Sequence, residues 1–267
     1  MNRTMVQPKN GDQRPAPEAI LFDLGNTLLE YGMHGRWRAF LHQRLATVYE
    51  MVCEDSAPTE QSSQVFAERV AEVIGGDHAQ TLMHSGVSWP FEARLSEALS
   101  KLGIECDEER TTRVIEEFYL PIRDSSRPYP DTYQTLDRLK ANGLKLAIIS
   151  NTPWDCPGYL TYGDMKKWGI DGYFQAALFS GDLAWRKPKP EIMLAAASEL
   201  RVAPSDCLVV GNDLASDIAG ANAAEMKSVW VHRDRATGPE GRQKATPDVT
   251  VEALSQVADL VEPRSEA

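Results

Sequence analysis

The stretch AILFDLGNTLLEYG, residues 19–32, is an apolar run that ends on Asp23 and passes directly into a turn-forming sequence, Gly25-Asn26-Thr27. Aspartate is disfavoured inside strands. The carboxyl ends of the strands in an open α/β sheet are where such sheets bind their ligands. The stretch therefore predicts a buried strand over 19–23 that delivers a carboxylate to the functional edge of a parallel sheet.

The carboxyl-terminal half of the chain repeats this pattern of apolar runs followed by polar residues. Four further strands are predicted at 144–150, 176–180, 207–211 and 228–231, and helices at 130–143, 189–202 and 217–226. Near-continuous apolar strands joined by helices are typical of a parallel sheet that is covered on both faces. We therefore expect a doubly wound, Rossmann-like α/β core.

Residues 33–123 break the alternation of strands and helices. Amphipathic helical patterns cover 36–52, 61–76, 91–103 and 107–122, and no convincing strand interrupts them. An insertion of this length is too long to be a loop. We expect three parts: a flexible tail over 1–17, an α/β core made of 18–32 and 124–262, and a small all-helical domain over 33–123, inserted after the first strand.

The composition limits the class of protein. A formal net charge of −11 argues against non-specific binding to nucleic acid or to an anionic membrane. The four cysteines are widely spaced without a CxxC pair, so we expect reduced thiols and no structural zinc. No segment has the apolar core of a signal peptide or the roughly 20 apolar residues of a membrane span. These features predict a soluble, cytoplasmic protein.

Polar side chains of the types used in catalysis and ligand binding follow the predicted strands. They are Asp23, Ser150 with Asn151, Lys187, and the group Asn212, Asp213 and Asp217. Each of them alone has a structural explanation, because such residues also cap helices and turns. Together they supply a carboxylate nucleophile, hydroxyl and amide donors, one cation and further acids for a divalent metal. Phosphoryl transfer to a carboxylate needs that combination.

Four segments in this order resemble the motifs of the haloacid dehalogenase-like (HAD) hydrolase superfamily. They are LFDLGNTLL (21–29), LAIISNT (146–152), RKPKPEIM (186–193) and VVGNDLASDIAGANAAEM (209–226). The helical insertion is similar to the C1-type cap of subfamily I, which closes over the site and selects the substrate. The resemblance thus implies a hydrolase with a cap domain, most commonly a magnesium-dependent phosphatase for a small phosphate monoester.

The resemblance also implies a role for individual residues. Asp23 matches the nucleophile that forms an aspartyl-phosphate intermediate, and Lys187 matches the lysine that steadies the nucleophile and the transferring group. Thr27, Ser150 and Asn151 match positions that support the first loop and bind phosphate. The implied Mg²⁺ ligands are Asp23, the Gly25 carbonyl, Asn212, Asp213 and Asp217.

Two positions depart from the family pattern. Gly25 stands where phosphatases carry a second aspartate that acts as general acid and base, and Asn212 stands where an aspartate is usual. General acid–base help typically contributes about 100- to 10,000-fold in rate. His34 and His42, early in the helical insertion, are candidates for a replacement acid. Two alternatives therefore stay open: a metal-independent 2-haloacid dehalogenase-type hydrolase, and a non-catalytic binding module.

The substrate cannot be read from the sequence. Arg36, Trp37 and Trp154 follow the first and second motifs, where they would either contact a substrate or pack the helical insertion against the core. A phosphonate-cleaving enzyme of this superfamily would need a lysine in the insertion. Lys101, the one lysine there, lies in a polar helical pattern typical of a surface residue.

Overall fold

The computed structural model describes residues 16–32, 36–53, 60–233 and 245–261, so the predicted tail over 1–17 lies almost wholly outside the described residues. A six-stranded sheet forms the centre, in the order β5-β4-β1-β6-β7-β8, and every neighbouring pair is parallel. The strands are β1 (Ala19–Phe22), β4 (Lys145–Ser150), β5 (Ala176–Phe179), β6 (Cys207–Gly211), β7 (Lys227–Val231) and β8 (Val249–Val251).

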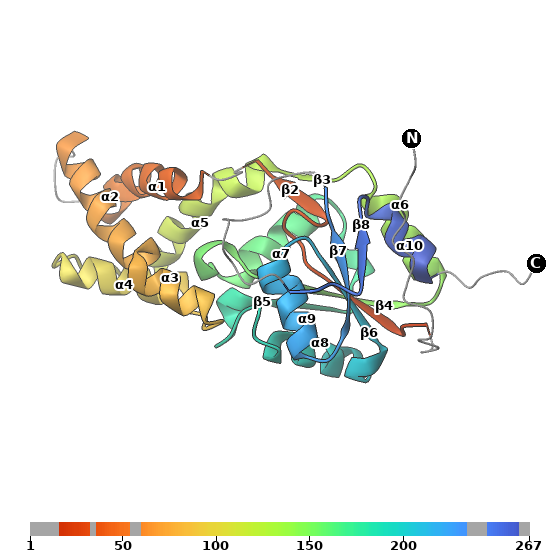
Figure 1. The fold of residues 1–267 in the computed structure, drawn as a ribbon. Helices are drawn as coiled ribbons and strands as arrows, with labels where there is room; N and C mark the ends of the chain where they lie inside the picture. Colours follow the sequence, from red (N-terminus) through yellow and green to blue (C-terminus); the bar gives the residue numbers. More distant parts are fainter. Residues whose placement is uncertain (1–15, 33–35, 54–59, 234–244, 262–267) are drawn as a thin grey trace, which may run out of the picture.

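Helices cover both faces of this sheet (Figure 1). They are α6 (Thr132–Ala141), α7 (Gly158–Lys167), α8 (Glu191–Leu200), α9 (Ala219–Ala223) and α10 (Ser255–Val261). Because side chains alternate along a strand, Ile20 and Phe22 of β1 pack into one apolar cluster with α6, α7 and α10. Leu21 packs into the other, with α8 and α9. The predicted doubly wound α/β fold is confirmed.

Each of the five predicted strands is present, with bounds that differ by at most one residue. Helices α7 and α10 and the edge strand β8 were not predicted. Helix α7 begins in PGYLTYG (157–163), where proline and two glycines weaken the helical pattern. The helix predicted at 217–226 begins earlier, as a π-helical turn over Leu214–Ile218 that leads into α9.

The insertion between β1 and β4 is helical as predicted. Its helices are α1 (Trp37–Val52), α2 (Glu60–Gly75), α3 (Asp77–His84), α4 (Phe91–Lys101) and α5 (Glu108–Ser125), of which α3 was not predicted. Figure 1 shows α1–α4 gathered at one end of the molecule, while α5 runs from them toward the sheet. The boundary predicted at 123 falls inside α5. The division of the chain into core and cap domains stays a prediction.

A short antiparallel ribbon joins the helical insertion to the sheet. Strand β2 (Leu29–Tyr31) pairs with β3 (Ser126–Pro128), so the segments that enter and leave the helical insertion lie next to each other. Neither strand was predicted, because a run of three residues carries no readable alternation. No helix among the described residues has the length and apolarity needed to cross a membrane.

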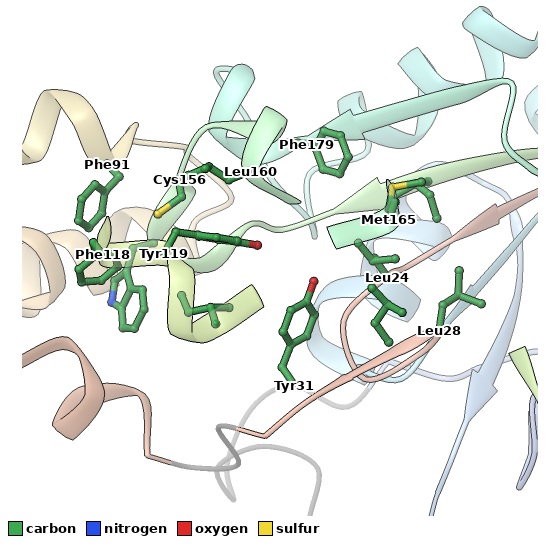
Figure 2. Close-up of a cluster of buried hydrophobic side chains, with 14 of the residues drawn as sticks. Leu24, Leu28, Tyr31, Phe91, Phe118, Tyr119, Cys156, Leu160, Met165 and Phe179 are labelled. Atoms are coloured by element: carbon green, nitrogen blue, oxygen red, sulfur yellow. The ribbon is translucent and has the colours of Figure 1, made fainter. Parts of the chain in front are cut away.

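A buried carboxylate fastens this ribbon to the core. Asp164 of α7 accepts hydrogen bonds from the hydroxyls of Tyr31 (2.9 Å) and Tyr119 (2.7 Å) and from Arg123 Nε (3.0 Å). Tyr31 belongs to β2, whereas Tyr119 and Arg123 belong to α5, and Figure 2 shows the two tyrosine side chains pointing toward each other. Burial raises the pKa of Asp164, although its hydrogen bonds counter this effect. Asp164 thus holds both connections of the helical insertion.

We expect Asp164→Ala to lower the free energy of unfolding by about 2–4 kcal/mol, because it leaves two buried hydroxyls and one guanidinium without their acceptor. Urea denaturation would measure the loss. The matched control is Asp137→Ala, since Asp137 accepts one exposed hydrogen bond from Tyr173. Equal losses in the two variants would contradict the role given to Asp164.

Candidate active site

Asp23 follows β1 at the carboxyl edge of the sheet, and its carboxylate is held from two sides. Lys187 Nζ donates to Oδ1 at 2.7 Å, and Thr27 Oγ1 donates to Oδ2 at 2.8 Å. Thr27 comes back toward Asp23 because Asn26 adopts a left-handed φ of 60°, which asparagine tolerates better than most residues. The turn after β1 therefore orients the carboxylate.

Lys187 is buried between two carboxylates. Its ammonium contacts Asp23 Oδ1 and Asp217 Oδ1, each at 2.7 Å, and donates to the Ile149 carbonyl at 2.8 Å. These three partners match the three N–H groups of an ammonium. Burial alone would lower the pKa of Lys187, but the charges of Asp217 and Asp23 outweigh it and raise that pKa. Lys187 is therefore a fixed positive charge.

The same cluster perturbs Asp23. Burial raises the pKa of the Asp23 carboxyl to about 6, against the lowering effect of Lys187 and with a further rise from Asp217. At neutral pH the carboxylate is ionised, and its ionised form is less stabilised than it would be in water. An anionic oxygen of this kind is suited to act as a nucleophile.

The residues after β4 have two different placements. Ser150 ends the strand and is buried. The side-chain amide of Asn151 instead exchanges two hydrogen bonds with the backbone of Lys187, accepting from its N–H (2.9 Å) and donating to its carbonyl (3.0 Å). Asn151 thus fixes the backbone that carries the lysine. This backbone contact was not predicted for Asn151, whose predicted role is phosphate binding.

The three polar residues after β6 also diverge. Asn212 Oδ1 accepts from Thr27 Oγ1 at 3.3 Å, so it faces the Asp23 turn. Asp213 Oδ1 caps the following turn by accepting from two of its backbone amides, at 2.7 and 3.2 Å. Asp217 contacts Lys187 through Oδ1, and its Oδ2 accepts from the Asp213 N–H at 2.9 Å. Of the three, Asn212 lies beside the turn that carries the predicted nucleophile.

These placements allow a test of whether the residues fit Mg²⁺. Across the described residues, no three His, Cys, Asp or Glu side chains come together as a metal-binding group. However, the Thr27 hydroxyl contacts both Asp23 Oδ2 and Asn212 Oδ1, so these two oxygens lie near each other on either side of Thr27. Mg²⁺ prefers oxygen ligands and needs few from the protein, since it retains water and binds substrate phosphate. Asp23 and Asn212 thus provide oxygen atoms of the kind that Mg²⁺ prefers, and the full set of Mg²⁺ ligands stays a prediction.

Gly25 leaves space beside the nucleophile. A Cβ atom at Gly25 would lie 3.5 Å from the Tyr31 ring, which is ordinary van der Waals contact. The Tyr31 hydroxyl donates to Asp164 and so is engaged elsewhere. Of the two histidines considered as replacement acids, His34 lies outside the described residues. His42 lies on α1, two residues after Phe40, whose ring stacks on Trp154. Two residues correspond to about 200° around a helix, so His42 lies on the opposite side of α1 from the contact with Trp154.

Trp154 packs between the core and the helical insertion. Its ring contacts Trp37 at 5.4 Å, Phe118 at 5.6 Å and Phe40 at 6.1 Å between centroids. This supports the packing interpretation of Trp37 and Trp154 over a substrate-binding one. Trp154 and Asp155 have left-handed φ values of 46° and 51°. Such residues cost about 1–3 kcal/mol each, and they persist where the surroundings fix them.

The sequence analysis did not single out Asp155. Its carboxylate is fully buried and pairs with Arg186, the residue before Lys187, at 2.8 Å. The one signal available was its position shortly after the predicted strand at 144–150. Lys101 pairs with Glu97 on an exposed face of α4, as expected of a surface lysine.

Comparisons with known proteins bear on the family and the fold of this chain. The sequence model of the haloacid dehalogenase-like hydrolases matches residues 17–225. A phosphoserine phosphatase of Thermus thermophilus is 27% identical over 91% of each chain. Two solved structures share the fold: a HAD phosphatase from Thermococcus onnurineus (TM-score 0.60, 24% identity) and a 2-haloacid dehalogenase from Pseudomonas syringae (TM-score 0.59, 22%). Each covers 91% of this chain and 97% of its own.

We expect Asp23→Asn to gain stability relative to the unsubstituted protein as the pH rises from 4 to 7. The Asp23 pKa rises from 3.8 to about 6 on folding. Between these two values the folded state binds more protons than the unfolded state, so the stability of the unsubstituted protein falls as the pH rises. Asparagine lacks that penalty. The stability difference should change by about 2–3 kcal/mol. Urea denaturation at both pH values, in EDTA, would measure it; a difference that stays constant would contradict the raised pKa.

Proposed function

The chain belongs to the haloacid dehalogenase-like hydrolases, and from this we propose that it is a magnesium-dependent phosphatase that acts on a small phosphate monoester. The observation that carries the proposal is the buried Lys187 ammonium, 2.7 Å from both Asp23 and Asp217. One fixed cation beside an ionised carboxylate is what attack on an anionic phosphoryl group requires. The relative from Thermus thermophilus, a phosphoserine phosphatase, supports a small phosphate ester as the substrate.

Asp23 is the nucleophile in this proposal. One of its carboxylate oxygens forms a bond to phosphorus and the bond from phosphorus to the ester oxygen breaks; the leaving oxygen takes a proton from solvent water, since Gly25 offers no acid. A water molecule then cleaves the aspartyl phosphate, gives up one proton to solvent, releases phosphate and restores Asp23. Lys187 offsets negative charge on the nucleophile and the transferring group. The Ser150 hydroxyl and the backbone amides after β4 hold the phosphoryl oxygens. Asn151 contributes through the backbone of Lys187.

Magnesium would be held by Asp23, the Gly25 carbonyl and Asn212, and it would offset the repulsion between the anionic nucleophile and the anionic substrate. Asp217 acts through Lys187, and Asp213 maintains the turn that presents Asn212. The protein's net charge of −11 makes a small molecule a better candidate partner than a nucleic acid. We propose the cytoplasm as its location.

A metal-independent dehalogenase-type hydrolase is the second candidate function. Gly25 favours it, because the site has no carboxylate there to protonate an alkoxide leaving group. The contact of Thr27 with both Asp23 and Asn212 favours the phosphatase, since it keeps near each other two oxygens of the kind that Mg²⁺ binds. A non-catalytic module would not require the complete set of contacts around Lys187.

We expect the purified protein to hydrolyse phosphate monoesters only when Mg²⁺ is present. Asp23→Asn should lower kcat by about 1,000-fold or more, because it removes the nucleophile. A panel that includes p-nitrophenyl phosphate, assayed with Mg²⁺ or EDTA, would measure this, with Asp137→Asn as the control. Turnover that persists in Asp23→Asn would refute the mechanism. Release of halide from 2-haloacids in EDTA would establish the second candidate instead.

Gly25→Asp should raise kcat on alkyl phosphates by about tenfold or more, because it introduces a carboxyl group beside the nucleophile. Hydrolysis of p-nitrophenyl phosphate should change little, since its leaving group departs without a proton. Gly25→Asn is the matched control, because it has the same size and no acid. Equal effects of the two substitutions on alkyl phosphates would show that the missing carboxyl is not limiting.

A further inference from the structure

A loop of the helical insertion lies against the loop that carries Lys187. We call Gly86–Trp89, between α3 and α4, the docking loop, and Ser180–Lys187, after β5, the lysine loop. Two backbone hydrogen bonds join them, from Ser88 N–H to the Ala184 carbonyl (3.2 Å) and from Arg186 N–H to the Gly86 carbonyl (3.0 Å). The Ser88 hydroxyl also donates to the Ser180 carbonyl at 2.6 Å. The loops therefore pair like two short strands.

The close approach of the two loops depends on glycine. Gly86 has a φ of +79°, and a Cβ atom there would lie 2.3 Å from Lys189 Cγ. A side chain at Gly86 would therefore force the docking loop away from the residues around Lys187.

Asp155 connects both loops to the core. Its Oδ1 accepts from Ser180 Oγ (2.6 Å) and from Arg186 Nη1 (2.8 Å), both on the lysine loop. Its Oδ2 accepts from the Trp89 N–H of the docking loop (3.2 Å). Asp155 itself lies in the turn after β4 and is fully buried. One carboxylate thus joins three segments that are distant in the sequence.

A second contact from the helical insertion reaches the same turn. Arg94 of α4 is fully buried and donates to the carbonyls of Trp154 and Ile74. Its guanidinium interacts electrostatically with the Asp155 carboxylate. A buried carboxylate needs charge pairing and hydrogen bonds. The helical insertion supplies one of these hydrogen bonds, from the Trp89 N–H, and a second cation, Arg94, beside the pairing of Asp155 with Arg186.

Residues of the turn after β4 hold the backbone around Lys187 in place. Arg186 is held by Asp155, and Lys187 itself is held by Asn151. Asn151 and Asp155 belong to the same segment after β4. A displacement of Arg186 would therefore move the adjacent Lys187 relative to Asp23, and small displacements of a reacting group cost rate steeply.

We infer that Asp155 is a positioning residue that couples docking of the helical insertion to the placement of Lys187. When the docking loop is seated, the Trp89 N–H completes the hydrogen bonds of Asp155, and the Gly86 carbonyl accepts from the Arg186 N–H. When it is not seated, Asp155 loses a partner and the lysine loop loses its pairing strand. The inference rests on the proposed function for its effect on catalysis, but the structural coupling can be measured without turnover.

The test compares Asp155→Asn, Arg186→Gln and their double variant. Asp155→Asn keeps the size of the side chain and removes the charge that holds Arg186. We expect each single variant to lower kcat roughly tenfold with KM changed less than about threefold, because substrate contacts remain while Lys187 is misplaced. If both act through one contact, the double variant is no slower than the slower single variant. Effects that multiply would overturn the inference.

Hydrogen exchange gives the second readout. In Asp155→Asn, the backbone amides of both the docking loop and the lysine loop should exchange faster. The amides of the six-stranded sheet should keep their protection from exchange. Faster exchange in the docking loop alone, or unchanged exchange in both, would overturn the coupling. The control is Asp248→Asn, because Asp248 accepts from the Ser228 N–H at 2.9 Å and pairs with Lys227 at the far edge of the sheet.

The two proposals fail separately. If the unsubstituted protein shows no hydrolysis that depends on Asp23, the proposed phosphatase is refuted, and the exchange experiment still decides the role of Asp155. If hydrolysis depends on Asp23 while kcat and exchange are unchanged in Asp155→Asn, the phosphatase stands and the inference about Asp155 is wrong.

Discussion

The buried ammonium of Lys187 lies between two carboxylates, and the loops around the site are arranged to keep it there. A single positive charge that is withdrawn from water is costly unless opposite charges and hydrogen bonds replace the lost solvation. Asp23 and Asp217 provide the charges, and the Ile149 carbonyl provides the third acceptor. Asp23 follows β1, Ile149 lies in β4, and Asp217 lies in the turn after β6. The Lys187 ammonium can therefore contact all three acceptors only when these adjacent strands end at the same level of the sheet.

This requirement explains why much of the fold and the site could be predicted. Apolar runs of five to seven residues identify strands β1, β4 and β6, and a polar residue directly after each run identifies the edge where they meet. Asp23, Lys187 and Asp217 were predicted and come together. The short strands β2 and β3 could not be predicted, because their stability comes from pairing with each other and from Asp164 rather than from a local pattern.

The roles of Asn151 and Asp155 could not be predicted for a related reason. Their partners lie 36 and 31 residues away, in a loop whose path the sequence does not reveal. Asparagine and aspartate after a strand are common in turns. The residue type alone therefore does not distinguish a side chain that binds phosphate from one that hydrogen-bonds to a neighbouring loop. Tertiary contacts decide between these roles, and in this protein they direct both side chains to the loop that carries the lysine.

The ribbon of β2 and β3 has an evolutionary consequence. Tyr31 and Ser126 are paired across it, so the two ends of the helical insertion lie side by side. Because the ribbon closes the insertion at its base, helices can be lengthened, lost or exchanged in descendants of this chain without changing the order of the sheet. The entropy of closing a longer insertion grows only slowly with its length. Helices of the insertion that do not contact the lysine loop can therefore diverge, while the docking loop and Arg94 stay tied to the carboxyl edge of the sheet.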